Sequence, residues 1–192
     1  MVVNHQVNHV RTYIHVCGWV AVLGVEVTRG GCFCRLTVNL TGTNTTLYSI
    51  IGSEVTKISI PPAYHTPTFG VNFGGVKPDI IKVVAAAKYD SWLTVGITDG
   101  DSNGDLGSAG LKFADWTSNK GIEANNSAVF WMKPTASTAK GSAAVTVAQL
   151  TVPKGLKFNC TMGLQGKKPL ADAKESGEDN WRAEGVTFPL GQ

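Results

Sequence analysis

Apolar residues along the chain occur in short segments separated by turn-forming residues. The segments are rich in Val, Thr, Ile and Phe, and Gly, Asn, Asp or Pro stands between them, as is typical of strands joined by turns. In the segment RLTVNL, Leu36, Val38 and Leu40 alternate with polar residues. Such alternation places one face of a strand in a core and the other in water. The pattern therefore predicts antiparallel sheets.

Nine segments carry this strand pattern. They are residues 35–40, 47–51, 55–60, 91–97, 111–113, 128–132, 143–152, 156–162 and 185–188. Many short strands with regular turn signals favour an all-β fold, which here means an antiparallel β-sandwich or jelly roll of about nine strands.

One segment has helical instead of strand periodicity. In residues 79–88, Ile80, Val84 and Ala87 fall on one helical face, and Pro78 precedes the segment at a position that a helix tolerates. We expect one short helix there, covering an end of a sheet. Residues 61–75 contain too much Pro and Gly for regular structure, so they predict a long ordered loop.

The first 31 residues differ from the rest. An apolar stretch of ten residues, 16–25, follows a start that carries two His, one Arg and no acid, which is similar to the apolar region of a signal peptide. Residues 1–31 are therefore either a signal-like leader or an extra N-terminal strand running through residues 19–27. Residues 32–192 are expected to form a single domain.

Composition excludes several classes of protein. The 192 residues are 43% hydrophobic and 16% charged, which is incompatible with intrinsic disorder. No uncharged apolar run reaches 18 residues, so no membrane span is expected. The net charge is only +3, and the sequence has no run of basic residues. Nucleic acid is therefore not an expected partner. Self-association through strand edges stays open.

Two features indicate an extracellular or cell-surface protein. N-x-S/T sequences, which are acceptors for glycosylation in secreted proteins, begin at Asn39, Asn44, Asn125 and Asn159. The disulfide candidates are Cys32, Cys34 and Cys160. Residues two apart in one strand do not easily bridge each other, so Cys160 is the better partner for one of the other two; the alternative is that the cysteines are buried free thiols.

The segment DGDSNGD, residues 99–105, has the densest set of oxygen ligands. The candidate ligands of Ca²⁺ are Asp99, Asp101, Asn103 and Asp105, because alternate oxygens in a sharply turning loop suit a hard cation. Gly110 stands where an EF-hand has its bidentate Glu, so an EF-hand is excluded. The alternatives are a calcium loop on a β scaffold and a hairpin turn whose Asp, Asn and Gly serve only backbone geometry.

Two tryptophans lie among polar loop residues. Trp116 and Trp181 are therefore candidates for exposed platforms that stack on a sugar ring; the alternative is a loop ring that packs over the end of the sandwich. Trp92 and Trp131 lie in predicted strands and are expected in the core. A serine triad of His65, Asp90 and Ser102 is excluded, because only twelve residues separate the last two.

Four stretches resemble a family of secreted β-rich proteins of unknown function from marine algae and bacteria. They are YDSWLTVG (Tyr89–Gly96), AVFWM (Ala128–Met132), AQLTVP (Ala148–Pro153) and GLQG (Gly163–Gly166). The resemblance implies an extracellular β domain and brings no catalytic residues with it.

These observations predict a structural or interaction module that is extracellular or at the cell surface, stabilised by Ca²⁺, with other extracellular proteins or glycans as partners. A carbohydrate-binding domain is the first alternative. A carbohydrate-active enzyme is the second, and it requires two acids facing each other in a groove beside an aromatic ring. No catalytic residue is assigned.

Overall fold

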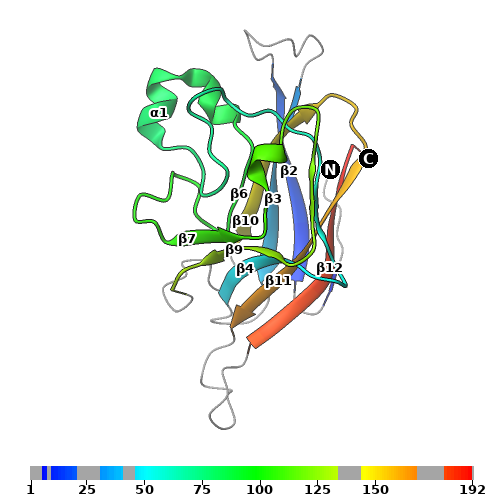
Figure 1. Cartoon of the computed structure of the whole chain (residues 1–192). Helices are drawn as coiled ribbons and strands as arrows, with labels where there is room; N and C mark the ends of the chain where they lie inside the picture. Colours follow the sequence, from blue (N-terminus) through cyan, green and yellow to red (C-terminus); the bar gives the residue numbers. More distant parts are fainter. Residues whose placement is uncertain are drawn as a thin grey trace.

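The computed structural model describes residues 6–7, 10–20, 31–40, 46–133, 144–167 and 180–191. Strands dominate this part of the chain, and two antiparallel sheets with one short α-helix make up the fold (Figure 1). The all-β prediction is confirmed. Among the residues just given, no helix has the length and apolar character needed to cross a membrane.

The first sheet contains the N-terminal strands. In spatial order it consists of β1 (Gln6–Val7), β2 (Val10–Val20), β3 (Gly31–Leu40), β10 (Ala144–Pro153) and β6 (Trp92–Leu93). The strand β2 pairs with β3 along most of its length. A strand is therefore present at residues 10–20, whereas the predicted strand at 19–27 falls mostly on residues 21–30, which are outside the described part of the chain.

The second sheet has β11 near its centre. In spatial order it consists of β7 (Leu106–Ala109), β9 (Ser127–Trp131), β4 (Thr46–Gly52), β11 (Phe158–Lys167), β5 (Ile58–Ile60) and β8 (Ile122–Ala124), and β12 (Asn180–Leu190) pairs with β11 along its length. Contacts between β12 and β2 bring an edge of each sheet together.

The inward faces of the two sheets share one hydrophobic core. Leu36 and Val38 from β3 join Ile50 from β4 and Met162 and Leu164 from β11 in this core, and all five side chains are fully buried. Burying each such side chain contributes about 1.5–3 kcal/mol. The apolar positions of RLTVNL therefore face the core as predicted, and the two sheets form a sandwich. The polar positions are not fully in water, because Thr37 is buried and Arg35 and Asn39 are half-buried.

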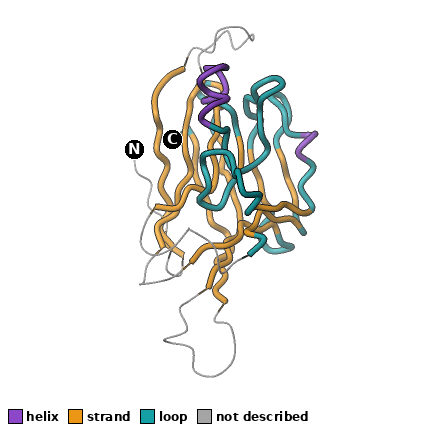
Figure 2. The backbone as a smooth tube through the Cα atoms, turned by 90° about the vertical axis from the view of Figure 1, so that its left-hand side faces the viewer, coloured by secondary structure: helices purple, strands orange, loops and turns teal. Residues whose placement is uncertain are grey.

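A helical excursion between β5 and β6 differs from the single helix predicted at residues 79–88. It consists of α1 (Pro78–Val83) followed by the 3-10 helix η1 (Ala85–Tyr89). The break falls at Val84, whose φ of −121° and ψ of 87° are not helical. The predicted apolar face is nevertheless the buried one, because it packs in a second cluster that contains Trp92. Figure 2 shows the helical segments and most of the loops on one side of the strands.

Some predicted strands are wrong or shorter. Residues 111–113 are not a strand; the 3-10 helix η2 (Phe113–Asp115) begins there. The segment 91–97 contributes only the two residues of β6. The strands β7 and β8 were not predicted, since each has only three or four residues and so short a segment shows no clear alternation.

Candidate functional site

One row of side chains crosses three strands on the outer face of the first sheet. In the strand register, Gln149 of β10 lies opposite Arg35 of β3 on one side and opposite Trp92 of β6 on the other. Directly opposed residues share a face of a sheet, so these three side chains stand next to one another. Leu36, the next residue along β3, points the other way into the core.

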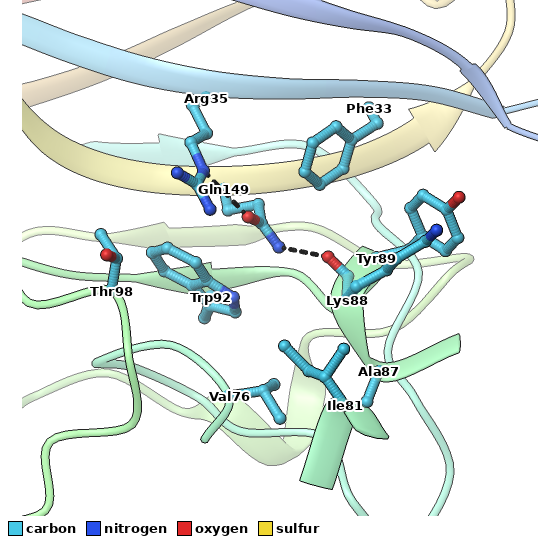
Figure 3. Close-up of a pocket in the computed structure, with 10 residues that line it drawn as sticks. All are labelled: Phe33, Arg35, Val76, Ile81, Ala87, Lys88, Tyr89, Trp92, Thr98 and Gln149. Atoms are coloured by element: carbon cyan, nitrogen blue, oxygen red, sulfur yellow. Dashed lines mark hydrogen bonds between the residues drawn. The ribbon is translucent and has the colours of Figure 1, made fainter. Parts of the chain in front are cut away.

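This row forms one wall of a cavity of about 400 Å³. Its described lining residues come from β3, β6, β10, the helical excursion and the loops beside it, and they are Phe33, Arg35, Val76, Ile81, Ala87, Lys88, Tyr89, Trp92, Thr98 and Gln149 (Figure 3). The volume lies within the range of small-molecule binding sites, roughly 300–1,000 Å³. We call this cavity the Arg35 pocket.

Gln149 holds the Arg35 pocket together. Its Nε2 donates to the carbonyl oxygens of Lys88 at 3.0 Å and Asp90 at 2.8 Å. Its Oε1 accepts a hydrogen bond of 3.1 Å from Nε of Arg35. The side chain is 2% exposed, so these bonds form out of water. They fix the end of η1 to the sheet and hold the guanidinium in one orientation.

The Arg35 pocket combines two cations with three aromatic rings. The guanidinium carbon of Arg35 lies 6.0 Å from the ring centroid of Trp92, and Nζ of Lys88 lies 4.6 Å from that of Tyr89. Phe33 packs edge-to-face on Tyr89 with the ring centroids 5.7 Å apart. Within the described part of the chain, no carboxylate lies within salt-bridge distance of either cation.

A buried carboxylate supports the loop beside the Arg35 pocket. Asp90 is fully buried, and its two oxygens accept 2.7 Å hydrogen bonds from the backbone N–H groups of Thr66 and Val71. Burial raises the pKa of Asp90 to about 6, although its backbone hydrogen bonds act in the opposite direction. One side chain thus ties both ends of the segment 66–71 to the end of η1.

His65 accompanies this carboxylate. Its Nδ1 lies 3.9 Å from Oδ1 of Asp90, and burial lowers the pKa of His65 to about 4. The imidazole packs edge-to-face on Trp116, with ring centroids 4.5 Å apart. Its Nε2 is buried and makes no hydrogen bond. A neutral imidazole is the form that suits these surroundings.

The loop 99–105 forms a turn closed by its own side chains. The carboxylate of Asp101 accepts hydrogen bonds from the backbone N–H groups of Asp105 at 2.8 Å and Leu106 at 3.0 Å, and Asn103 donates to Asp105 at 3.3 Å. Asp99 is exposed. Over the described ranges, no three His, Cys, Asp or Glu side chains gather in a way that would hold a metal. Binding of Ca²⁺ at Asp99, Asp101, Asn103 and Asp105 stays a prediction.

The predicted aromatic platforms lie elsewhere and differ from each other. Trp116 is 3% exposed and its Nε1 donates to the carbonyl of Pro61 at 2.9 Å, so the exposed platform is wrong for this residue and the alternative, a ring packed against the sandwich, is correct. The hydrogen bond to a backbone carbonyl satisfies the indole N–H, so the ring can be buried in the core. Trp181 is half-buried, and its Nε1 donates to the carbonyl of Thr46 at 3.1 Å. Neither ring lines the Arg35 pocket.

The disulfide prediction is not supported by the structure. Cys32, Cys34 and Cys160 are present as thiols. Cys34 and Cys160 are buried in the core, where a cysteine packs as a small apolar residue. Burial, and secondarily the proximity of Cys34, raises the pKa of the Cys160 thiol well above its ordinary value.

The glycosylation candidates occupy different surroundings. Asn125 and Asn159 are exposed, whereas Asn39 is half-buried in β3 and its Oδ1 is buried without a hydrogen-bond partner. Asn44 lies outside the described residues. The exposed pair therefore offers the better acceptors.

No protein-family model, curated protein or solved structure matches the chain. The resemblance to secreted β-rich proteins and the extracellular setting both stay predictions.

Sequence reasoning missed the residues of the Arg35 pocket. The alternation in residues 35–40 predicts Arg35 on the wet face of a strand, and nothing in the sequence gives Gln149 a role. The prediction of Trp92 in the core is confirmed, since its side chain is 1% exposed. The signal that joins the three is the strand register across β3, β10 and β6, which pairs residues far apart in the chain. Arg35 is in fact half-buried, because the helical excursion covers the outer face of the sheet there.

Proposed function

We propose that the chain is an extracellular or cell-surface β-sandwich that acts as an interaction module by binding a sugar-sized ligand in the Arg35 pocket. The observation that carries the proposal is a preformed cavity of about 400 Å³ between a sheet face and a helical excursion, lined by both aromatic and polar side chains. The two functions predicted first, an interaction module and a carbohydrate-binding domain, coincide in this site.

The lining favours binding over catalysis. Among its described residues there is no carboxylate, imidazole or thiol, whereas a typical glycoside hydrolase needs two carboxyl groups about 5–9.5 Å apart. The rings of Phe33 and Tyr89 are half-buried at the pocket, so part of each faces the cavity. Apolar ring faces with a few fixed polar groups are the usual composition of a ligand site.

The Arg35 pocket is also rigid. Gln149 uses both of its amide N–H donors on the backbone beside η1 and one lone pair of its amide oxygen on Arg35. Since these groups are already in place, a ligand does not have to order them, and preorganisation of this kind lowers the free-energy cost of binding.

Binding can be tested by NMR titration of ¹⁵N-labelled protein with neutral and acidic monosaccharides. We expect shifts in the side-chain amide of Gln149 and the indole N–H of Trp92. Tyr89→Ala should weaken these shifts because it removes a ring from the wall. Phe69→Ala is the matched control, since Phe69 is an exposed aromatic residue outside the pocket. The absence of shifts at both reporters with every sugar would contradict the proposal.

The extracellular setting has its own test. Asn125 and Asn159 are exposed, which supports modification at these positions in a secretory pathway. Expression through that pathway should give a chain whose gel mobility increases after enzymatic removal of N-glycans. The change should be lost when both residues are replaced by Gln, and a chain that carries no glycan would remove this support.

A further inference from the structure

We propose that the ligand of the Arg35 pocket carries an oxyanion, a carboxylate or a sulfate ester on a six-membered sugar ring, and that the oxyanion binds the guanidinium of Arg35. This inference rests on the proposed function and names the class of ligand. It follows from three features of the pocket: an uncompensated cation, the fixed direction of that cation, and a wall of rings beside it.

Arg35 is a half-buried cation without a carboxylate partner in the described part of the chain. A guanidinium carries five N–H donors, and among the described residues only Nε is used, in the bond to Gln149. A charge that is partly removed from water without a counter-ion is costly. An incoming oxyanion would both neutralise the charge and accept the remaining donors.

The bond from Nε to Gln149 also directs the guanidinium. Figure 3 shows the end of the Arg35 side chain pointing into the cavity, between Gln149 and Thr98 and above the ring of Trp92. The planar fork of a guanidinium matches the geometry of two oxygens on one carboxylate or sulfate. Thr98 also lines this cavity, and its side chain carries a hydroxyl, which can donate a hydrogen bond.

Lys88 brings a second positive charge to the Arg35 pocket. Its side chain is exposed, and Nζ lies over the ring of Tyr89. The carboxylate nearest in sequence, Asp90, accepts backbone hydrogen bonds from the segment 66–71 and does not line the cavity. Both cations therefore act on the ligand site without an acid among the described lining residues to offset them.

The rings define the rest of the ligand. Phe33 and Tyr89 pack on each other edge-to-face and line the cavity together with the buried ring of Trp92, so a ligand anchored at Arg35 lies beside aromatic side chains. The C–H face of a sugar ring suits such a surface. Glucuronate and glucose 6-sulfate both combine an oxyanion with this ring, and glucose is the matched neutral compound.

The experiment compares these three probes by NMR titration, with the side-chain amide of Gln149 as the reporter. We expect one or both anionic sugars to bind about 10- to 100-fold more tightly than glucose, since a charge-assisted hydrogen bond contributes that much. The tighter of the two identifies carboxylate or sulfate as the preferred group. Arg35→Met should abolish the preference and Arg35→Lys should restore part of it.

Two further variants keep the test decisive. Lys88→Met changes an exposed residue and should leave the fold intact, so it can be used even if Arg35→Met does not fold. It should weaken binding of the anionic sugars several-fold. Lys157→Met removes an exposed cation that does not line the pocket, and it should leave the preference unchanged. If Lys157→Met lowers the preference as much as Lys88→Met, general charge attraction explains it and the assignment to Arg35 is overturned.

The outcomes separate the two proposals. If glucose binds as tightly as both anionic sugars, the oxyanion inference is wrong and the binding function stands. If none of the three sugars moves the Gln149 reporter, both proposals are wrong. Binding of the anionic sugars with an unchanged affinity in a folded Arg35→Met protein would place the anion elsewhere and overturn the inference.

Discussion

The buried pair His65 and Asp90 leads to a prediction about stability against pH. Burial lowers the pKa of His65 from 6.5 to about 4 and raises that of Asp90 from 3.8 to about 6. Each difference from the ordinary pKa corresponds to about 3 kcal/mol. Because the two shifts have opposite directions, their effects on the free energy of unfolding also have opposite signs.

The signs follow from which state binds the proton. Between pH 6.5 and 4 the unfolded chain protonates His65 while the fold keeps it neutral, so the stability due to His65 is lost as the pH falls. Between pH 6 and 3.8 the fold protonates Asp90 while the unfolded chain does not, so the stability due to Asp90 increases as the pH falls. In the wild-type protein the two contributions largely cancel.

Replacing either His65 or Asp90 by a residue that does not titrate reveals how the other one changes the free energy of unfolding with pH. Relative to the wild type, Asp90→Asn should lose about 3 kcal/mol between pH 7 and pH 4, and His65→Gln should gain a similar amount over the same range. Asp90→Asn also lowers stability at every pH, because an amide cannot accept from both Thr66 and Val71. The slope with pH, and not the absolute stability, is therefore the decisive quantity.

The assay is urea unfolding followed by tryptophan fluorescence, at half-unit steps from pH 4 to pH 7.5. Glu123→Gln removes an exposed carboxylate outside the pair and should run parallel to the wild type. Curves that stay parallel for all four proteins would refute the reasoning, because they would mean that neither group has a shifted pKa.

Three further predictions concern two single-residue contacts and the loop 99–105. Trp116→Phe keeps a ring but loses the hydrogen bond to Pro61, so urea unfolding should show a loss of about 1–3 kcal/mol; an unchanged midpoint would mean that the indole N–H contributes nothing. Gly75→Ala places a Cβ against the carbonyl oxygen of Thr98 at a φ of +82°, and it should lower the free energy of unfolding by more than about 1 kcal/mol; a variant as stable as the wild type would show that the backbone yields there. If Ca²⁺ binds the loop 99–105, EDTA should lower the melting temperature and Asp101→Ala should abolish that effect, whereas identical melting with and without chelator would rule the ion out.

Local patterns in the sequence determined the class of fold. The alternation around Leu36 and Val38 places these side chains in the core of a sandwich, because a strand has a side-chain period of two whatever it pairs with. Likewise, Ile80 and Val84 face inward although the predicted helix is broken at Val84. These are properties of consecutive residues, and hydrophobic burial follows from them directly.

Only the tertiary structure decided what stands next to what. Trp116 lies among polar residues in the sequence, yet a carbonyl 55 positions away accepts from its indole and the ring is buried. Arg35 and Gln149 are 114 positions apart, and the register of β3, β10 and β6 alone brings them together with Trp92. The alternation within a strand constrains which face it presents, but which distant strands pair with each other depends on contacts between residues far apart in the chain. The sequence therefore predicts the sandwich, whereas the Arg35 pocket exists because distant strands align and a helical excursion covers them.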